Sequence, residues 1–181
     1  MDSLERPTTP EEILIALRTG GRNKAPGSDG IGLEFYSTNW ETIRTDLHGI
    51  LNQMFLQKNI TPQQKHGVIV CLPKPNGAQT PGYHPITLLK TDYKILGRIL
   101  GNRLHPVLED HLKTSQFCSV PGNSILEALS IVCETTAHSE KTDTPLCVLT
   151  LDFQDAFDRI SHQYLFQILQ SYGISPWFIE L

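Results

Sequence analysis

The chain has 181 residues, of which 39% are hydrophobic and 19% charged, and its formal net charge is −4 at pH 7. This composition is typical of a globular domain and excludes a long disordered protein. No apolar run approaches the ~20 residues that cross a bilayer, and the acidic, polar start is unlike a secretory signal. We therefore expect an intracellular protein without a membrane partner, and the sequence leaves nucleus and cytoplasm equally open.

Charge is distributed unevenly along the chain. Residues 1–64 carry 6 basic and 8 acidic residues, residues 65–115 carry 7 and 3, and residues 116–181 carry 2 and 8. A positive section suits contact with phosphate groups, and an acidic section suits metal binding. Segregation of this size also arises without function, so it supports a nucleic-acid partner only weakly.

The first third of the sequence predicts two helices. Thr9-Pro10-Glu11-Glu12 combines an N-cap, a first-turn proline and a capping-box glutamate, which predicts a helix that runs to about Arg18 and ends at Gly20-Gly21. Apolar residues then recur at helical spacing and predict one long amphipathic helix from about Leu33 to Gln57. We expect its aromatic stripe to pack in the core and not to bind a cofactor.

The middle and end of the chain predict a hairpin and three further helices. Residues 66–72 are expected to form a β-strand, which the turn-rich segment Pro73–Pro85 joins to a second strand near Ile86–Leu88. The helices are expected at Thr91–Leu104, Ser124–His138 and Ser161–Tyr172, the last ending at Gly173. We expect the final helix to turn four residues inward, namely Leu165, Ile168, Leu169 and Tyr172.

Residues 146–153 alternate in side-chain direction and predict a buried strand. Cys147, Leu149, Leu151 and Phe153 share one wholly apolar face, and the opposite face ends in Asp152. Asp152 thus lies at the end of this predicted strand and is followed by an aromatic turn. Its carboxylate is a ligand type suited to Mg²⁺. The alternative is an aspartate that merely caps the next turn.

Four segments together resemble the reverse transcriptases of non-LTR (LINE-like) retrotransposons. Residues 151–162 resemble motif A of this family, in the form LDFxxAFDRISH. Residues 25–36 resemble APGxDG…EFY, residues 70–89 resemble LIPKPN…YRPISLL, and residues 120–125 resemble VPGRSI. Any one motif alone is weak, but four in the family's order make chance an improbable explanation.

The resemblance implies an α+β fold: a truncated right-hand polymerase, with the fingers at 1–145 and the first strand and helix of the palm at 146–181. The family's second metal-binding element, an aromatic-Ala-Asp-Asp hairpin, does not occur in these 181 residues. Two arginine positions of the family pattern are His84 and Asn123 here. A neutral imidazole at His84 weakens the expected phosphate contact.

The resemblance further implies RNA-directed DNA synthesis on an RNA template and a DNA primer, with deoxynucleoside triphosphates as substrates and Mg²⁺ as the metal. Asp152 would be the catalytic, metal-binding carboxylate. Contacts with the incoming nucleotide are implied for Lys74, His84, Asp155, Ala156 and Phe157. Template contacts are implied for Gly122 and Asn123, and Lys90, Lys94 and Arg98 could follow a template backbone because they share one helix face.

Other interpretations stay open. Lys74 could be a solvated surface lysine, Phe157 a packed core residue, and the basic stripe simply the wet side of a helix. One metal-ligand carboxylate cannot place both ions of a two-metal displacement, so we expect the chain to be inactive alone. The competing hypotheses are a catalytically inert or domesticated RNA- or protein-binding remnant and, more remotely, a metal-dependent phosphohydrolase with Asp152 as its nucleophile.

Overall fold

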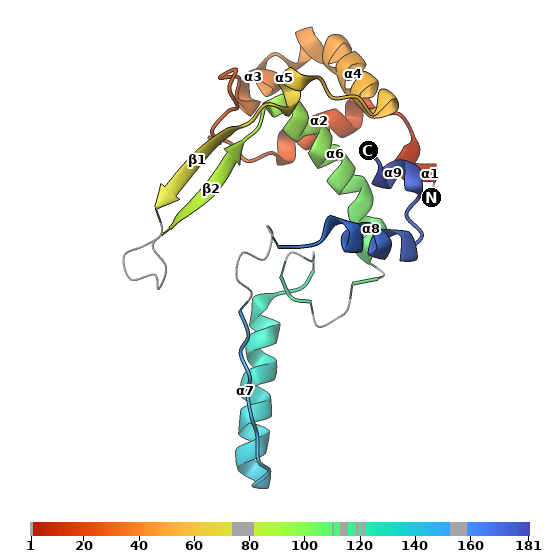
Figure 1. Ribbon diagram of the computed structural model, residues 1–181. Coiled ribbons are helices and arrows are strands. Elements are labelled where there is room, and N and C mark those ends of the chain that lie inside the picture. The colour runs from red at the N-terminus through yellow and green to blue at the C-terminus, as the bar shows by residue number, and fades with distance from the viewer. Residues whose placement is uncertain are drawn as a thin grey trace. The chain divides into compact units, whose positions relative to one another are not determined.

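The computed structural model describes residues 2–73, 82–109, 111, 112, 116–118, 120, 122–152 and 159–181. The chain divides into two compact units, which we call unit 1 (residues 1–104 and 176–181) and unit 2 (residues 105–175). Across the described residues, helices combine with one small antiparallel sheet (Figure 1), which confirms a mixed helix and sheet fold. The division into fingers and palm at residue 145 is not tested by these units and stays a prediction.

The first predicted helix is confirmed as α2 (Pro10–Thr19). The Thr9 side chain accepts a hydrogen bond from the Glu12 backbone N–H, and the Glu12 carboxylate accepts one from the Thr9 N–H, so the predicted capping box forms. Gly20 follows the last helical residue. A short helix that the sequence did not predict, α1 (Asp2–Glu5), precedes α2.

The single long helix predicted over 33–57 is wrong, because the structure has two helices there. These are α3 (Leu33–Thr38) and α4 (Trp40–Gln57), and Asn39 between them has φ −97° and ψ 13°. The Asn39 side chain donates to the Phe35 carbonyl at 2.8 Å, and its backbone N–H donates to the same oxygen. An asparagine that occupies the helical acceptor with its own side chain offers the backbone an alternative to continuing the helix.

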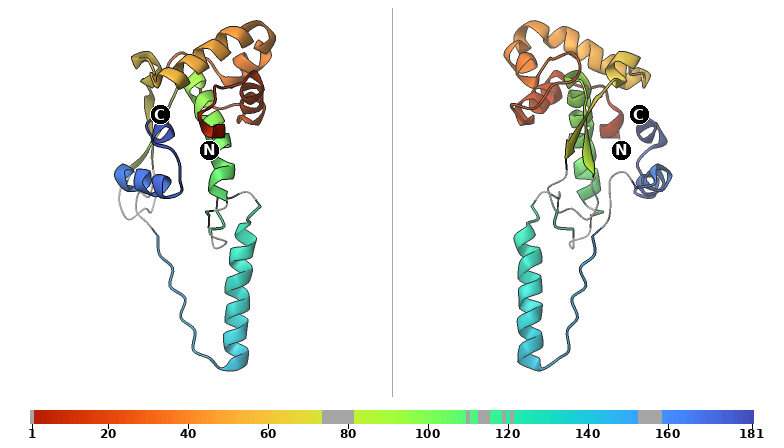
Figure 2. Two further views of the ribbon diagram at one scale, coloured as in Figure 1. Left: turned by 90° about the vertical axis from the view of Figure 1, so that its right-hand side faces the viewer. Right: turned by 60° about the vertical axis from the view of Figure 1, so that its left-hand side comes forward.

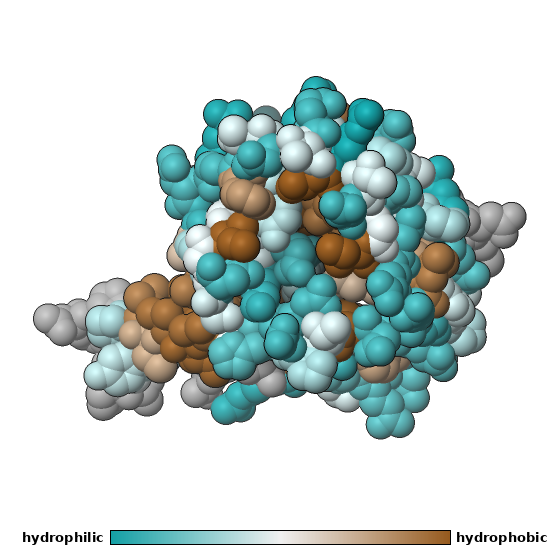
Figure 3. All heavy atoms as spheres, turned by 90° about the horizontal axis from the view of Figure 1, so that it is seen from above, coloured by the Kyte–Doolittle hydropathy of each residue, from teal (hydrophilic) through white to brown (hydrophobic). Residues whose placement is uncertain are grey.

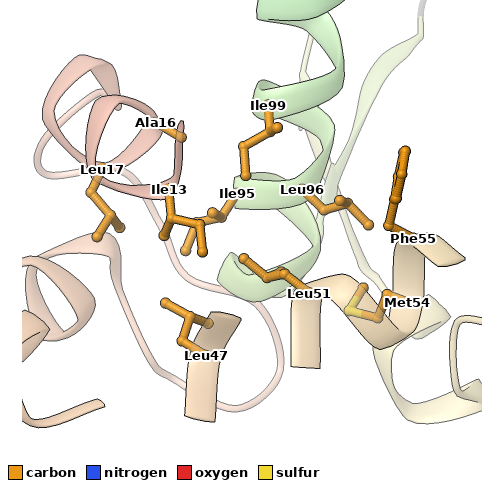
Figure 4. Packing of buried hydrophobic residues seen from close by; sticks show 10 residues of the cluster. All are labelled: Ile13, Ala16, Leu17, Leu47, Leu51, Met54, Phe55, Ile95, Leu96 and Ile99. Atoms are coloured by element: carbon orange, nitrogen blue, oxygen red, sulfur yellow. The ribbon is translucent and has the colours of Figure 1, made fainter. Parts of the chain in front are cut away.

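Three helices of unit 1 enclose its hydrophobic core. α2, α4 and α6 (Thr91–Glu109) contribute the ten buried side chains shown in Figure 4, which are Ile13, Ala16, Leu17, Leu47, Leu51, Met54, Phe55, Ile95, Leu96 and Ile99. α9 (Pro176–Ile179) places Trp177 edge-on against Phe55, with 4.9 Å between the ring centroids. α6 continues beyond its predicted end near Leu104 and includes Pro106.

Arg103 fastens the first residues of the chain to this core. Its side chain is 4% exposed, and the guanidinium donates to both Glu12 carboxylate oxygens, at 2.8 and 2.7 Å. It also donates to the carbonyls of Leu4, Arg6 and Pro7, at 3.2, 2.6 and 3.0 Å. The charge of Arg103 can be buried because its guanidinium forms an ion pair with Glu12 and donates its other hydrogen bonds to backbone carbonyls.

The predicted hairpin is confirmed as β1 (Val68–Pro73) and β2 (Tyr83–Leu88), and β2 begins earlier than expected. The strands are antiparallel, with Val68 opposite Leu88 and Pro73 opposite Tyr83. A short helix, α5 (Pro62–Lys65), precedes them. Apolar side chains remain exposed on the hairpin, and Figure 3 shows them as a brown area at the left of a largely teal surface.

Unit 2 contains α7 (Ile125–Thr142), whose predicted N-cap, Ser124, accepts a hydrogen bond from the Leu126 N–H. None of its residues is buried. The strand predicted at 146–153 is wrong for its described part, because residues 144–152 form no helix or strand and are all exposed. Figure 2 shows this segment leaving the end of α7 as an extended chain. Its side chains alternate as in a strand, but none of the described strands pairs with it.

The last predicted helix is α8 (His162–Ser171), and Ser161 caps it as expected. Gly173 follows with φ +79°, a conformation that favours glycine and ends the helix. Ile168, Leu169 and Tyr172 are partly buried, but Leu165 is 42% exposed, so its predicted inward position is wrong. The Tyr172 ring lies 4.5 Å from the ring of His111.

Candidate functional site

The predicted catalytic residue, Asp152, is the last described residue of the exposed segment 144–152. Residues 153–158 lie outside the described part of the chain, and with them the predicted nucleotide contacts Asp155, Ala156 and Phe157. The next described element is α8. The structure therefore places Asp152 on an accessible stretch of chain and leaves the rest of this predicted group untested.

The described residues do not fit a metal ion on their own. No group of three or more His, Cys, Asp or Glu side chains comes together within 2–73, 82–109, 111–112, 116–118, 120, 122–152 or 159–181. A divalent cation such as Mg²⁺ requires several oxygen ligands, and Asp152 supplies only one carboxylate.

The predicted nucleotide contacts of the hairpin are only partly visible. The backbone of His84 lies in β2 opposite Leu72 of β1, and its side chain is outside what the structure describes. Lys74 follows β1 directly and also lies outside the described residues. Both contacts stay predictions.

Gly122 and Asn123 form a turn that leads into α7. Gly122 has φ +85°, which favours glycine, and the Asn123 backbone N–H donates to the Val120 carbonyl at 3.2 Å. The Asn123 amide donates to the Gln116 carbonyl at 2.6 Å. Asn123 therefore stabilises its own loop, and this contact is one that the sequence did not predict.

The basic stripe on α6 has a structural role as well as its charge. Lys94 donates from Nζ to the Ala25 carbonyl at 3.1 Å, and Arg98 donates from Nη1 to the Thr19 carbonyl at 2.6 Å. Thr19 is the last residue of α2, and Ala25 lies in the loop that follows it. The stripe is therefore not simply a solvated face, because Lys94 holds the glycine-rich loop and Arg98 holds the end of α2 against α6.

The glycine-rich motif of residues 25–30 packs directly on the start of α6. A Cβ atom at Gly27 would lie 2.6 Å from the backbone nitrogen of Lys90, so only glycine fits there without a shift. The buried Thr91 hydroxyl donates to the Ile31 carbonyl at 2.6 Å. The glycine-rich motif and the start of α6 are distant along the chain, but they pack against each other.

A cavity of about 120 Å³ lies between this loop and α6. It is lined by three basic side chains, Lys24, Lys94 and Arg98, and by Ala16, Gly21, Ala25, Leu33, Thr91 and Ile95. Sequence reasoning identified Lys94 and Arg98 but missed Lys24. Its position directly before the glycine-rich motif is the only signal that could have found it.

Burial and two acidic side chains shift the pKa of Tyr36, which also belongs to unit 1. Burial, with the negative charges of Asp92 and Asp29, raises the pKa of Tyr36 to about 12. Asp92 also accepts a hydrogen bond from the Gln64 amide at 3.0 Å. Tyr36 thus stays protonated at neutral pH and acts as part of the scaffold.

Comparison with known proteins identifies the chain's relatives. Residues 72–181 match the family model described as reverse transcriptase (RNA-dependent DNA polymerase). The chain is 34% identical over 179 residues to the transposon TX1 uncharacterized 149 kDa protein of Xenopus laevis, covering 98% of this chain and 14% of that protein. No helix among the described residues is both long and apolar enough to cross a membrane.

Two further relatives come from insect elements. The chain is 29% identical over 171 residues to a retrovirus-related Pol polyprotein from the type-1 retrotransposable element R2 of Popillia japonica, covering 93% of this chain and 23% of that protein. It is 26% identical over 196 residues to a probable RNA-directed DNA polymerase from transposon BS of Drosophila melanogaster, covering 98% and 21%. The chain spans less than a quarter of each of these relatives. It belongs to the reverse transcriptase family, and its homologues are the reverse transcriptases of LINE-like, non-LTR retrotransposons.

Proposed function

We propose that the chain contributes the fingers and the start of the palm to an RNA-directed DNA polymerase that copies an RNA template from a DNA primer. The observation that carries this proposal is the family match over residues 72–181, which includes the motif A segment with Asp152. The proposed substrates are deoxynucleoside triphosphates, with Mg²⁺ as the ion. We propose that this activity takes place inside the cell.

In this proposal Asp152 would hold one of two metal ions, and these ions would supply the charge that activates a primer hydroxyl and stabilises a triphosphate. The roles that we propose are contacts with the triphosphate for Lys74 and His84, and contact with the sugar for Phe157. Further carboxylates must complete the site, since one cannot hold both ions. The chain alone is therefore expected not to polymerise.

Primer extension tests the proposal in two steps. The 181-residue chain, with Mg²⁺ or Mn²⁺ and an RNA template, should show no incorporation above that of its Asp152→Asn variant. A chimera in which the chain replaces the matching segment of the R2 relative should extend the primer, and Asp152→Asn should lower that activity by at least about 100-fold, as loss of a charge-stabilising group does.

Asp143→Asn is the matched control for the chimera. Asp143 is an exposed aspartate with φ +52° at the end of α7, and asparagine tolerates that conformation. The control should retain activity. Equal activity of the Asp152→Asn chimera and its parent would contradict the proposal, as would a folded but inactive chimera with Asp152 intact.

A second candidate is an inert or domesticated RNA-binding remnant. It is favoured by the exposed position of Asp152 and by the absence, among the described residues, of any group of three or more acidic, histidine or cysteine side chains that could hold a metal ion. This candidate predicts salt-sensitive RNA binding by the isolated chain, together with an inactive chimera.

A further inference from the structure

We propose that the cavity between the glycine-rich loop and α6 is a phosphate-binding site formed by Lys24, Lys94 and Arg98. The proposal deepens the proposed function, on which the identity of the phosphate carrier rests. That carrier is either a backbone phosphate of nucleic acid or the triphosphate of a nucleotide. The chemistry recognised is the same in both cases.

The lining of the cavity carries an excess of positive charge. Three cations from segments about 70 residues apart face one cavity, and no acidic side chain lines it. Within the described residues, none of the three lies within 4.0 Å of a carboxylate, although ion pairs occur elsewhere in unit 1. This local excess of positive charge occurs in a chain whose net charge is −4. Uncompensated cations lower the free energy of a bound anion.

Two of these cations, Lys94 and Arg98, are already oriented by hydrogen bonds. The hydrogen bonds from Lys94 to the Ala25 carbonyl and from Arg98 to the Thr19 carbonyl fix both side chains. Each bond occupies one donor, while an ammonium group has three donors and a guanidinium group five. Both residues therefore keep free N–H groups, and an anion that binds them loses less side-chain entropy than one that must order flexible residues.

Part of the cavity wall is apolar. It includes Ala16 and Ile95, which are buried, and Leu33, which is partly buried. An apolar wall lowers the local dielectric and strengthens the attraction between an anion and the nearby cations. Gly27 keeps the loop close to α6, because a side chain there would collide with the backbone of Lys90.

Substitution of Lys24 can distinguish an effect on phosphate binding from an effect on folding. No hydrogen bond from its side chain occurs in the described structure, whereas Arg98 donates to the last residue of α2, Thr19. Lys24→Gln should therefore weaken phosphate binding without lowering the stability of the chain. Arg98→Gln should weaken binding and also loosen the packing of α2 on α6. Lys65→Gln, at an exposed lysine of α5 outside the cavity, removes the same charge and is the matched control.

The test is an NMR titration of the full 181-residue chain with inorganic phosphate. Saturable shifts at the amides of Gly21, Ala25 and Ile95 are expected. Lys24→Gln should weaken the affinity about tenfold, the size expected for one charge-assisted hydrogen bond, with unfolding unchanged, and Lys65→Gln should leave the affinity unaltered. Absent shifts, or equal affinity of Lys24→Gln and the parent chain, would overturn the proposal.

Competition identifies the carrier. Displacement of phosphate by single-stranded RNA without a terminal phosphate assigns the site to a nucleic-acid backbone. Displacement by a deoxynucleoside triphosphate alone, in the absence of metal, assigns it to the nucleotide. Displacement by neither contradicts the assignment to polymerase substrates. Because this assay does not involve Asp152, its failure is distinguishable from failure of the chimera in primer extension.

Discussion

Two helices of equal length, α4 and α7, differ in what surrounds them. Each has 18 residues and apolar side chains at helical spacing. α4 buries Leu47, Leu51, Met54 and Phe55, whereas no residue of α7 is buried. An amphipathic pattern therefore predicts a helix in both places, but it predicts burial only where another apolar surface of the chain meets it. The predictions below test this contrast.

Truncating one core leucine and one surface leucine should give the largest difference. Leu51 is fully buried in α4, and Leu51→Ala should lower the free energy of unfolding by about 3 kcal/mol through lost transfer energy and a cavity. Leu129 of α7 is 56% exposed, and Leu129→Ala should cost less than about 0.5 kcal/mol. Urea denaturation followed by circular dichroism measures both. Similar costs would show that α7 has a buried face.

Removing Arg103 should cost about as much as a core truncation. Arg103→Met removes the Arg103 donors from three backbone carbonyls and from the Glu12 carboxylate, which keeps those of Arg6 and Thr9, and the expected loss is about 3 kcal/mol. Arg44→Met is the control, since Arg44 pairs with Glu41 at 3.7 Å on the surface and should contribute less than about 0.5 kcal/mol. Equal urea midpoints for the two variants would show that the Arg103 contacts are not stabilising.

The same contacts predict a smaller, pH-dependent effect. Burial alone would raise the pKa of Glu12, but hydrogen bonds from Arg103 and the Thr9 N–H, with the charges of Arg103 and Arg6, lower it from 4.5 to about 2. Because the folded-state pKa is the lower one, this stabilisation is present above pH 4.5 and is lost as the pH falls toward 2. Stability of Glu12→Gln should change less over that range. Parallel curves for the two proteins would contradict this assignment.

The caps and ends of helices were predicted correctly from the sequence, because their signals come from neighbouring residues. The capping box at Thr9, the caps at Ser124 and Ser161, and the stop at Gly173 are all confirmed because each depends on residues within one turn. The break at Asn39 was missed because the apolar periodicity continues across it. The strand at 146–152 was wrong because alternation does not reveal whether a partner strand is present.

The candidate site was less accessible to sequence reasoning. Motif A indicated Asp152, and helical spacing indicated Lys94 and Arg98. Lys24 and the carbonyls that orient the two α6 cations became visible only in three dimensions, because they lie about 70 residues away along the chain. The family resemblance supplied roles that no local pattern carries, and for Lys74, Asp155, Ala156 and Phe157 these roles stay predictions.

Amide hydrogen exchange on the monomeric chain tests the central contrast most directly. Amides of residues 47–55, inside the core of unit 1, should exchange only through large-scale unfolding, whereas those of residues 146–152 should exchange nearly as fast as in an unfolded peptide. Strong protection of 146–152 in a monodisperse monomer would contradict the account, because it would mean that the chain itself covers the segment that leads to Asp152.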